Sequence, residues 1–137
     1  MTLSSLIRKA NRVYVVGNGG SFANSMHIVN DLLSVGVKAY AMDPSTLTAF
    51  ANDYGYHQCF ARWIYIVGEK DDLLIALSGS GKSLNILLAI TEAEGKGMYI
   101  WKEFGAEKGL GMQAAEERQI GLGHETMMEL RNALSLN

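Results

Sequence analysis

The sequence has little cysteine, little proline and no cluster of basic residues. Its one cysteine, Cys59, cannot form an internal disulfide, so we expect a reducing, cytoplasmic setting. The formal net charge is −2, and no run of lysine and arginine stands out. This charge distribution argues against nucleic acid or an anionic membrane as a main partner.

Long apolar runs are also missing. No stretch approaches the roughly 20 apolar residues of a membrane span, and the opening segment MTLSSLIRKANR lacks the apolar region of a signal peptide. The chain is 48% hydrophobic and 19% charged, which is ordinary for a folded globular protein. Because no repeat or linker divides it, we expect residues 1–137 to form one domain.

Short apolar runs alternate with segments of helical periodicity. The run LLIAL is apolar without alternation, as in a strand that is buried on both faces of a parallel sheet. Strands that alternate with helices imply βαβ units, so we expect one α/β sandwich. The expected strands are residues 12–16, 37–42, 73–77, 97–101 and 118–122. The expected helices are residues 3–10, 21–34, 56–67, 83–94 and 107–116, one that begins at Pro44 behind the cap Asp43, and a closing helix from residue 124.

Two loops rich in glycine and serine follow strands of this sheet. The 17–21 loop reads GNGGS and follows the first strand, and the 78–83 loop reads SGSGKS and follows the third. In parallel sheets, ligands bind beyond the carboxyl ends of the strands. Each loop presents backbone N–H groups at a helix N-terminus, which favours an anion. The alternative is that glycine and serine only form tight turns, and two such loops in one small sheet weaken that alternative.

The 78–83 loop does not have the pattern of a nucleotide-binding P-loop. That pattern needs a glycine five positions before the Gly-Lys pair, and Ala76 stands there, inside the strand. The strand at 97–101 is not followed by an aspartate for magnesium. The 17–21 loop also fails the dinucleotide pattern G-x-G-x-x-G, because Phe22 occupies the last glycine position.

Three segments of the chain resemble the sugar isomerase (SIS) domain family. They read GNGGSFANSMHIVNDL, NDYGYHQCFARWI and LLIALSGSGKSLNILLAI, and they lie between about residues 13 and 98. The resemblance is greatest to the branch that isomerises phosphorylated heptoses. It implies a flavodoxin-like, three-layer α/β/α sandwich around a five-stranded parallel sheet. It also implies a homodimer or homotetramer with active sites between subunits.

The resemblance implies a set of residues that bind a phosphorylated sugar. In the family the second loop reads Ser-Thr-Ser-Gly-Asn-Ser and cradles the sugar phosphate; here Gly79 replaces the threonine and Lys82 the asparagine. The implied phosphate contacts are Ser78, Gly79, Ser80 and Ser83. The implied contacts to the rest of the sugar are Asn18, Gly19, Gly20, Ser21 and Asp53.

Moving a carbonyl between C2 and C1 of a sugar needs a base and a second acid/base group. On the helix expected at 21–34, His27 and Asp31 share a polar stripe at i, i+4 spacing. Family members have glutamate as the base at this place, so the resemblance implies Asp31 as the base. The alternatives are that the two side chains pair on a solvated face, or that they form half of a zinc site. The reaction itself requires no cofactor.

The C-terminal part departs from the family pattern. The family has a Gln-Glu-x-His stretch before its last helix and a catalytic histidine one and a half turns further on. Here His124 is the only histidine in this part, Glu129 is expected at the place of the catalytic one, and both ends of the domain are shortened. We therefore expect His124, or a group from a neighbouring subunit, to be the acid. Two functions remain: an aldose–ketose isomerase, or a non-catalytic module that binds a sugar phosphate for regulation or protein–protein interaction.

Overall fold

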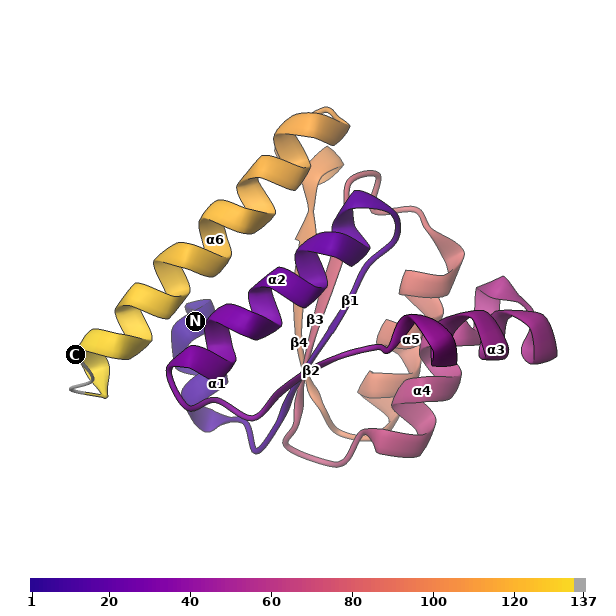
Figure 1. Cartoon of the computed structure of the whole chain (residues 1–137), viewed down its shortest axis with the longest axis horizontal. Helices are drawn as coiled ribbons and strands as arrows, with labels where there is room; N and C mark the ends of the chain where they lie inside the picture. The colour runs from indigo at the N-terminus through magenta and orange to yellow at the C-terminus, as the bar shows by residue number, and fades with distance from the viewer. Residues whose placement is uncertain (135–137) are drawn as a thin grey trace.

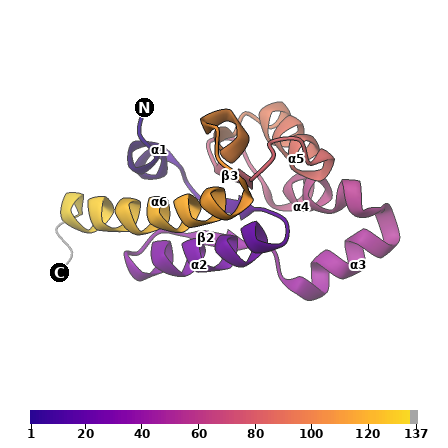
Figure 2. The ribbon, with the colours of Figure 1, turned by 90° about the horizontal axis from the view of Figure 1, so that it is seen from above.

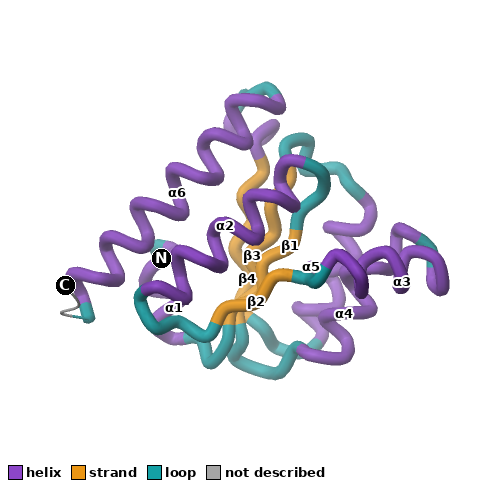
Figure 3. The backbone as a smooth tube through the Cα atoms, in the orientation of Figure 1, coloured by secondary structure: helices purple, strands orange, loops and turns teal. Residues whose placement is uncertain are grey.

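The computed structural model describes residues 1–134 and is built on a four-stranded parallel sheet (Figure 1). The strands are β1 (Val13–Val16), β2 (Ala39–Ala41), β3 (Leu73–Ser78) and β4 (Tyr99–Phe104), in the order β2-β1-β3-β4. Every residue of β1 and β3 is buried. Their central place explains why both sequences are apolar without alternation. β2 and β4 form the two edges, and the connecting loops gather at the two ends of the sheet (Figure 3).

Helices cover both faces of the sheet, as the sequence predicted (Figure 2). One layer holds α1 (Leu3–Lys9), α2 (Gly20–Ser34) and α6 (Met112–Ala133). The other holds α3 (Pro44–Tyr54), α4 (Cys59–Val67) and α5 (Leu84–Gly95), with the short 3₁₀ helices η1 (Tyr56–Gln58) and η2 (Gly105–Lys108) in the connections. Successive side chains of β1 point to opposite layers: Val13 and Val15 join the core under α2, and Tyr14 and Val16 join the core under α4 and α5.

Local signals fix the start of α3. The side chain of Asp43 accepts a hydrogen bond from the amide of Thr46 at 3.2 Å, and Pro44 is the first helical residue. This confirms the predicted cap. No residue of α3 is buried, and the helix projects from the side of the sandwich (Figure 2).

The predicted fifth strand is wrong. Residues 118–122 lie inside α6, which is one continuous helix of 22 residues, so the helices expected on either side of them are also joined. The stretch before it is rich in alanine, glutamate and glutamine, which are strong helix formers. The buried residues of α6 recur every three or four positions, which is helical spacing: Ala115, Gln119, Gly123, Thr126 and Leu130. The sheet therefore ends at β4 within the described part of the chain.

No helix within residues 1–134 is both long and apolar enough to cross a membrane.

The core under α4 supplies a test of the packing. Phe60 is completely buried between the sheet and α5, so Phe60→Ala should lower the free energy of unfolding by about 3–5 kcal/mol, measured by urea denaturation. Leu33 on α2 is 54% exposed, so Leu33→Ala should change the free energy of unfolding by less than about 0.5 kcal/mol. Similar losses in the two variants would contradict the assignment of these side chains to core and surface.

Candidate functional site

The two predicted loops meet at the carboxyl edge of the sheet. The 17–21 loop joins β1 to α2 and the 78–83 loop joins β3 to α5, and β1 pairs directly with β3. Between them lies a small cavity of about 50 Å³. Its lining residues are Asn18, Ser21, Leu77, Ser78, Gly79, Ser80, Ser83 and Met112. Six of the nine predicted substrate-binding residues are therefore neighbours in space.

The 78–83 loop is held by its own hydroxyl groups. The Oγ atom of Ser78 accepts from the amide of Gly81 at 2.9 Å, and the Oγ atom of Ser80 accepts from the amide of Lys82 at 3.1 Å. Each hydroxyl keeps its own proton to donate. Ser83 caps α5 with no hydrogen bond from its side chain to the helix. The loop thus places hydroxyl donors at a helix N-terminus, where a negative group is favoured.

The 17–21 loop is tied to the second layer by a pair of amides. Asn18 donates to the Oδ1 atom of Asn85 at 2.8 Å, and Asn85 donates back to the Oδ1 atom of Asn18 at 2.9 Å. The Tyr56 hydroxyl donates to the same oxygen of Asn18 at 2.6 Å. Asn85 is 3% exposed, and the other buried residues of α5 are apolar. Its buried amide holds Asn18 in place, a role that the sequence analysis missed.

Cys59 lies beneath this amide pair. Its Sγ atom is 3.9 Å from the amide nitrogen of Asn85, and its side chain is completely buried. Burial raises the pKa of the Cys59 thiol, against a smaller opposing effect of the hydrogen bond from Asn85. The thiol is therefore a packing group, not an activated nucleophile.

A carboxylate lies at the N-terminus of α2. Gly19 caps this helix with φ of +56°, a conformation that favours glycine. At Gly20 a Cβ atom would overlap the carboxylate of Glu116, so this carboxylate of α6 occupies the space that glycine leaves at the start of α2. Because this helix terminus already faces a negative group, the 78–83 loop is the better place for a phosphate.

A buried glutamine joins α2 to α6. Gln119 is 1% exposed; it donates to the Oγ atom of Ser21 at 3.0 Å and accepts from Asn24 at 2.8 Å. Asn24 also donates to the carbonyl of Glu116 at 3.0 Å. Going along α2, Ser21, His27 and Ser34 contact residues of α6 that follow one another in the same order: Gln119, His124 and Met127. The two helices therefore run parallel (Figure 1).

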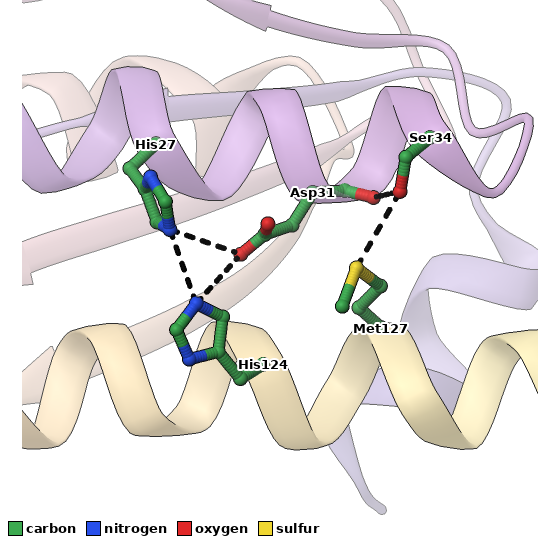
Figure 4. Close-up of polar contacts among 5 residues, drawn as sticks. All are labelled: His27, Asp31, Ser34, His124 and Met127. Carbon is green, nitrogen blue, oxygen red and sulfur yellow. Dashed lines mark hydrogen bonds and ion pairs between the residues drawn. The ribbon is translucent and has the colours of Figure 1, made fainter.

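Two turns beyond Ser21, His27, Asp31 and His124 form a three-residue cluster (Figure 4). The Nε2 atoms of the two histidines are 3.1 Å apart, and each is 3.7 Å from the Oδ2 atom of Asp31. Asp31 is 7% exposed, and its Oδ2 atom is buried without a hydrogen-bond partner. The histidine side chains are 46% and 49% exposed. A desolvated carboxylate thus lies between two imidazoles that reach solvent.

The cluster corrects the expectation for Glu129. The carboxylate of Glu129 accepts a hydrogen bond from Ser4 of α1 at 2.7 Å, whereas His124 faces Asp31. His124, and not Glu129, is therefore the residue of α6 that lies at the cluster.

The cluster has the donor set of a zinc site. Catalytic zinc is commonly held by two histidines and a carboxylate at about 2.0–2.1 Å, which puts tetrahedral ligand atoms about 3.3 Å apart. The separations here are 3.1 and 3.7 Å. The buried Oδ2 atom of Asp31 lacks a partner, which also fits a cation between the three groups. The donor atoms thus fit zinc by type and spacing; zinc at His27 and Asp31 stays a prediction, with His124 as a third candidate ligand.

Asp53 lies apart from both groups. It is exposed near the end of α3 and accepts a hydrogen bond from Asn52 at 3.2 Å, so its contact with a sugar stays a prediction. A larger hollow of about 470 Å³ lies between α1 and the end of α6. Neither loop and no residue of the histidine–aspartate cluster lines it.

The chain is a parallel α/β/α sandwich with both loops at the carboxyl edge of its sheet, the edge at which such domains bind their ligands. A family model described as "SIS domain" matches residues 2–101, and the chain belongs to this family. Among solved structures, the chain is similar to a phosphoheptose isomerase from Francisella tularensis, with a TM-score of 0.83 and 27% identity, covering 95% of this chain and 80% of that one. It is also similar to a phosphoheptose isomerase from Neisseria gonorrhoeae, with a TM-score of 0.85 and 23% identity, covering 95% of this chain and 81% of that one.

Curated relatives carry the same name. The phosphoheptose isomerase of Burkholderia pseudomallei (strain 1710b) is 45% identical over 100 residues, which are 67% of this chain and 51% of that protein. That of Sodalis glossinidius is 38% identical over 129 residues, 89% of this chain and 66% of the relative. The chain spans about half to two-thirds of the length of these two relatives.

Gln119 supplies a test of the contact between α2 and α6. Gln119→Leu leaves the buried hydroxyl of Ser21 without its donor, so the free energy of unfolding should fall by about 1–3 kcal/mol in urea denaturation. Gln113 is exposed on the same helix, and Gln113→Leu is the matched control, with a change below about 0.5 kcal/mol. Equal stability of the two variants would contradict the role of Gln119 in joining the helices.

Proposed function

We propose that this chain acts as an aldose–ketose isomerase on a phosphorylated heptose, interconverting sedoheptulose 7-phosphate and a heptose 7-phosphate. The observation that carries the proposal is the buried carboxylate of Asp31 between His27 and His124. It lies on the helix that begins beside the 78–83 loop. The relatives named phosphoheptose isomerase support the same substrate.

The phosphate group of the substrate binds at the 78–83 loop in this proposal. Ser80 and Ser83 donate hydroxyl protons to it, and the free amides at the start of α5 face it. Lys82 is exposed beside the loop and adds a positive charge. The 17–21 loop, with Asn18 and Ser21 in the cavity wall, binds hydroxyl groups of the sugar.

The separation of the two groups calls for a long substrate. Asp31 lies eleven residues after Gly20 on α2, which is about 16 Å along a helix axis. In an extended heptose 7-phosphate, the reacting C1–C2 end and the phosphate stand at opposite ends of the carbon chain. With the phosphate at the 78–83 loop, the substrate would lie extended along α2 with its reacting carbons toward Asp31, where proximity favours proton transfer.

The reaction needs two proton transfers to form the enediol and two more to convert it into the aldose. The carboxylate of Asp31 takes the proton from C1 of the ketose, and the C–H electron pair becomes the C1–C2 double bond. His124 gives a proton to the carbonyl oxygen on C2, which completes the enediol. His124 then takes the proton of the C1 hydroxyl, and Asp31 returns its proton to C2, which forms the aldose with no net gain or loss of atoms.

Zinc is an alternative occupant of this cluster. When bound by His27, Asp31 and His124, it would polarise the sugar oxygens as a Lewis acid. It would also take up the carboxylate of Asp31 and the imidazole of His124, so the acid–base steps above belong to the metal-free cluster. We also expect two or more copies to associate in the cytoplasm, because a second subunit against the half-exposed histidines would exclude water from the site.

A second candidate is a non-catalytic module that binds a sugar phosphate. It is favoured by the length of Asp31, which is one methylene shorter than the glutamate of the family, and by the position of its Oδ2 atom between two histidines. A carboxylate with less reach retains binding more easily than turnover. Proton exchange at the sugar carbons separates the two candidates.

Asp31→Asn tests the catalytic proposal. It keeps the size of the side chain and removes the base, so isomerisation of sedoheptulose 7-phosphate should fall roughly hundredfold or more. Exchange of the C1 and C2 protons with deuterium oxide, followed by NMR, is the measurement, with and without EDTA. Glu125 is exposed next to His124, and Glu125→Gln is the control that should keep full exchange. Binding by the unaltered chain without exchange would favour the non-catalytic module.

The phosphate contacts have a separate test. Ser80→Ala and Ser83→Ala should each weaken binding of sedoheptulose 7-phosphate roughly tenfold in calorimetry, because each removes a hydrogen bond to a charged group. Ser83 makes no side-chain bond to its helix, so its loss should leave stability unchanged. Ser45 is exposed on α3, and Ser45→Ala should bind like the unaltered chain. Unchanged affinity in both loop variants would remove the 78–83 loop from the binding site.

A further inference from the structure

The first residue of α6 lies over the 78–83 loop. α6 begins at the carboxyl edge of the sheet (Figure 1), and Met112 lines the cavity between the loops. A Cβ atom added at Gly79 would overlap the Sδ atom of Met112 and lie 2.8 Å from its Cε atom. The thioether therefore rests directly on the backbone of the loop, in the space that Gly79 leaves free.

With Met112 in this position the cavity is too small for a sugar phosphate. Its volume of about 50 Å³ has room for a few water molecules at most, since one needs roughly 10–15 Å³ by this kind of measure. Pockets that hold small molecules are about 300–1,000 Å³. Ser80 is exposed, whereas Ser78 is buried and lines the cavity together with Met112. A phosphate that enters the inner part of the loop therefore needs the space that the methionine fills.

The backbone beneath Met112 is fixed. The amide of Ala106 donates to the carbonyl of Gly79 at 2.8 Å, and Gly105 packs against Ala115 of α6 so closely that a Cβ atom there would overlap the Ala115 methyl group. Movement of the whole helix would break these contacts. The side chain of Met112 is 56% exposed, and its three rotatable bonds let it turn toward solvent without moving the backbone.

We propose that Met112 closes the 78–83 loop in competition with a phosphate group, and that its side chain turns outward when the phosphate enters. The inference rests on the proposed function, because it assigns the phosphate to this loop. Closure stabilises the empty loop with apolar contacts and so lowers its affinity for the ligand. Met112 thus sets how tightly the loop binds a phosphate, although it forms no hydrogen bond with the phosphate itself.

Met112→Ala tests the closure. Removal of the plug should tighten binding of inorganic phosphate and of sedoheptulose 7-phosphate roughly fivefold in calorimetry, because the partly buried side chain no longer has to leave the loop. Met128 is 59% exposed on the same helix, and Met128→Ala should bind like the unaltered chain. In the unaltered chain labelled with ¹³C-methyl methionine, phosphate should shift the Met112 methyl signal and leave that of Met128 in place.

The outcomes separate this inference from the proposed function. Equal or weaker binding by Met112→Ala, in a variant whose urea denaturation shows that it is folded, overturns the closure but leaves the loop as the phosphate site. A Met112 methyl signal that phosphate does not shift also overturns it. If neither the unaltered chain nor Met112→Ala binds phosphate or sugar phosphate, the assignment of the loop fails, and the closure fails with it.

Discussion

The packing of α6 on α2 is the contact on which the geometry of the candidate site depends. Three positions make this packing possible. Gly123 allows the helices to approach, since a Cβ atom there would lie 2.9 Å from the Cγ1 atom of Ile28. Gln119 donates a hydrogen bond to Ser21, and Gly20 leaves space for Glu116. With this register set, His124 comes to lie opposite Asp31. Rotation of α6 by one residue, about 100°, would separate them.

The same helix connects the two parts of the site. Its first turn lies over the 78–83 loop through Met112, its second faces the start of α2 through Glu116, and its fourth carries His124. The helix layer on the opposite face of the sheet also contacts the site, because Asn85 of α5 forms two hydrogen bonds with Asn18 of the 17–21 loop. The loops are therefore positioned by side chains from both faces of the sheet, which limits their freedom before any ligand arrives.

The sequence predicted the sheet and the loops because their signals are local. β3 is apolar throughout, Asp43 and Pro44 mark a helix start, and glycine and serine mark the loops. α6 was divided wrongly because its buried stripe, which includes Ala115, Gln119 and Thr126, is small or polar. A hydrophobic pattern does not reveal such a face, since the stripe packs by close approach and hydrogen bonds.

The site was predictable only in part for a related reason. Asp31 was identified from the resemblance and His124 as the only histidine of the C-terminal part, but their contact depends on a helix register that no local pattern encodes. The partner of Asn18 was missed because Asn85 stands 67 positions away in the chain. The distance between Met112 and Gly79 likewise arises only after η2 turns the chain back over the sheet.

The parallel course of α2 and α6 has an electrostatic consequence. Neighbouring helices that point the same way set their dipoles side by side with like ends together, which is less favourable than the antiparallel arrangement. The carboxylate of Glu116 at the start of α2 and Arg131 in the last turn of α6 offset part of this repulsion. The amino ends of α2, α5 and α6 lie at one edge of the sheet. Since Glu116 already faces the start of α2, the start of α5 is left as the helix end whose dipole favours a doubly negative solute, although the net charge of the chain is −2.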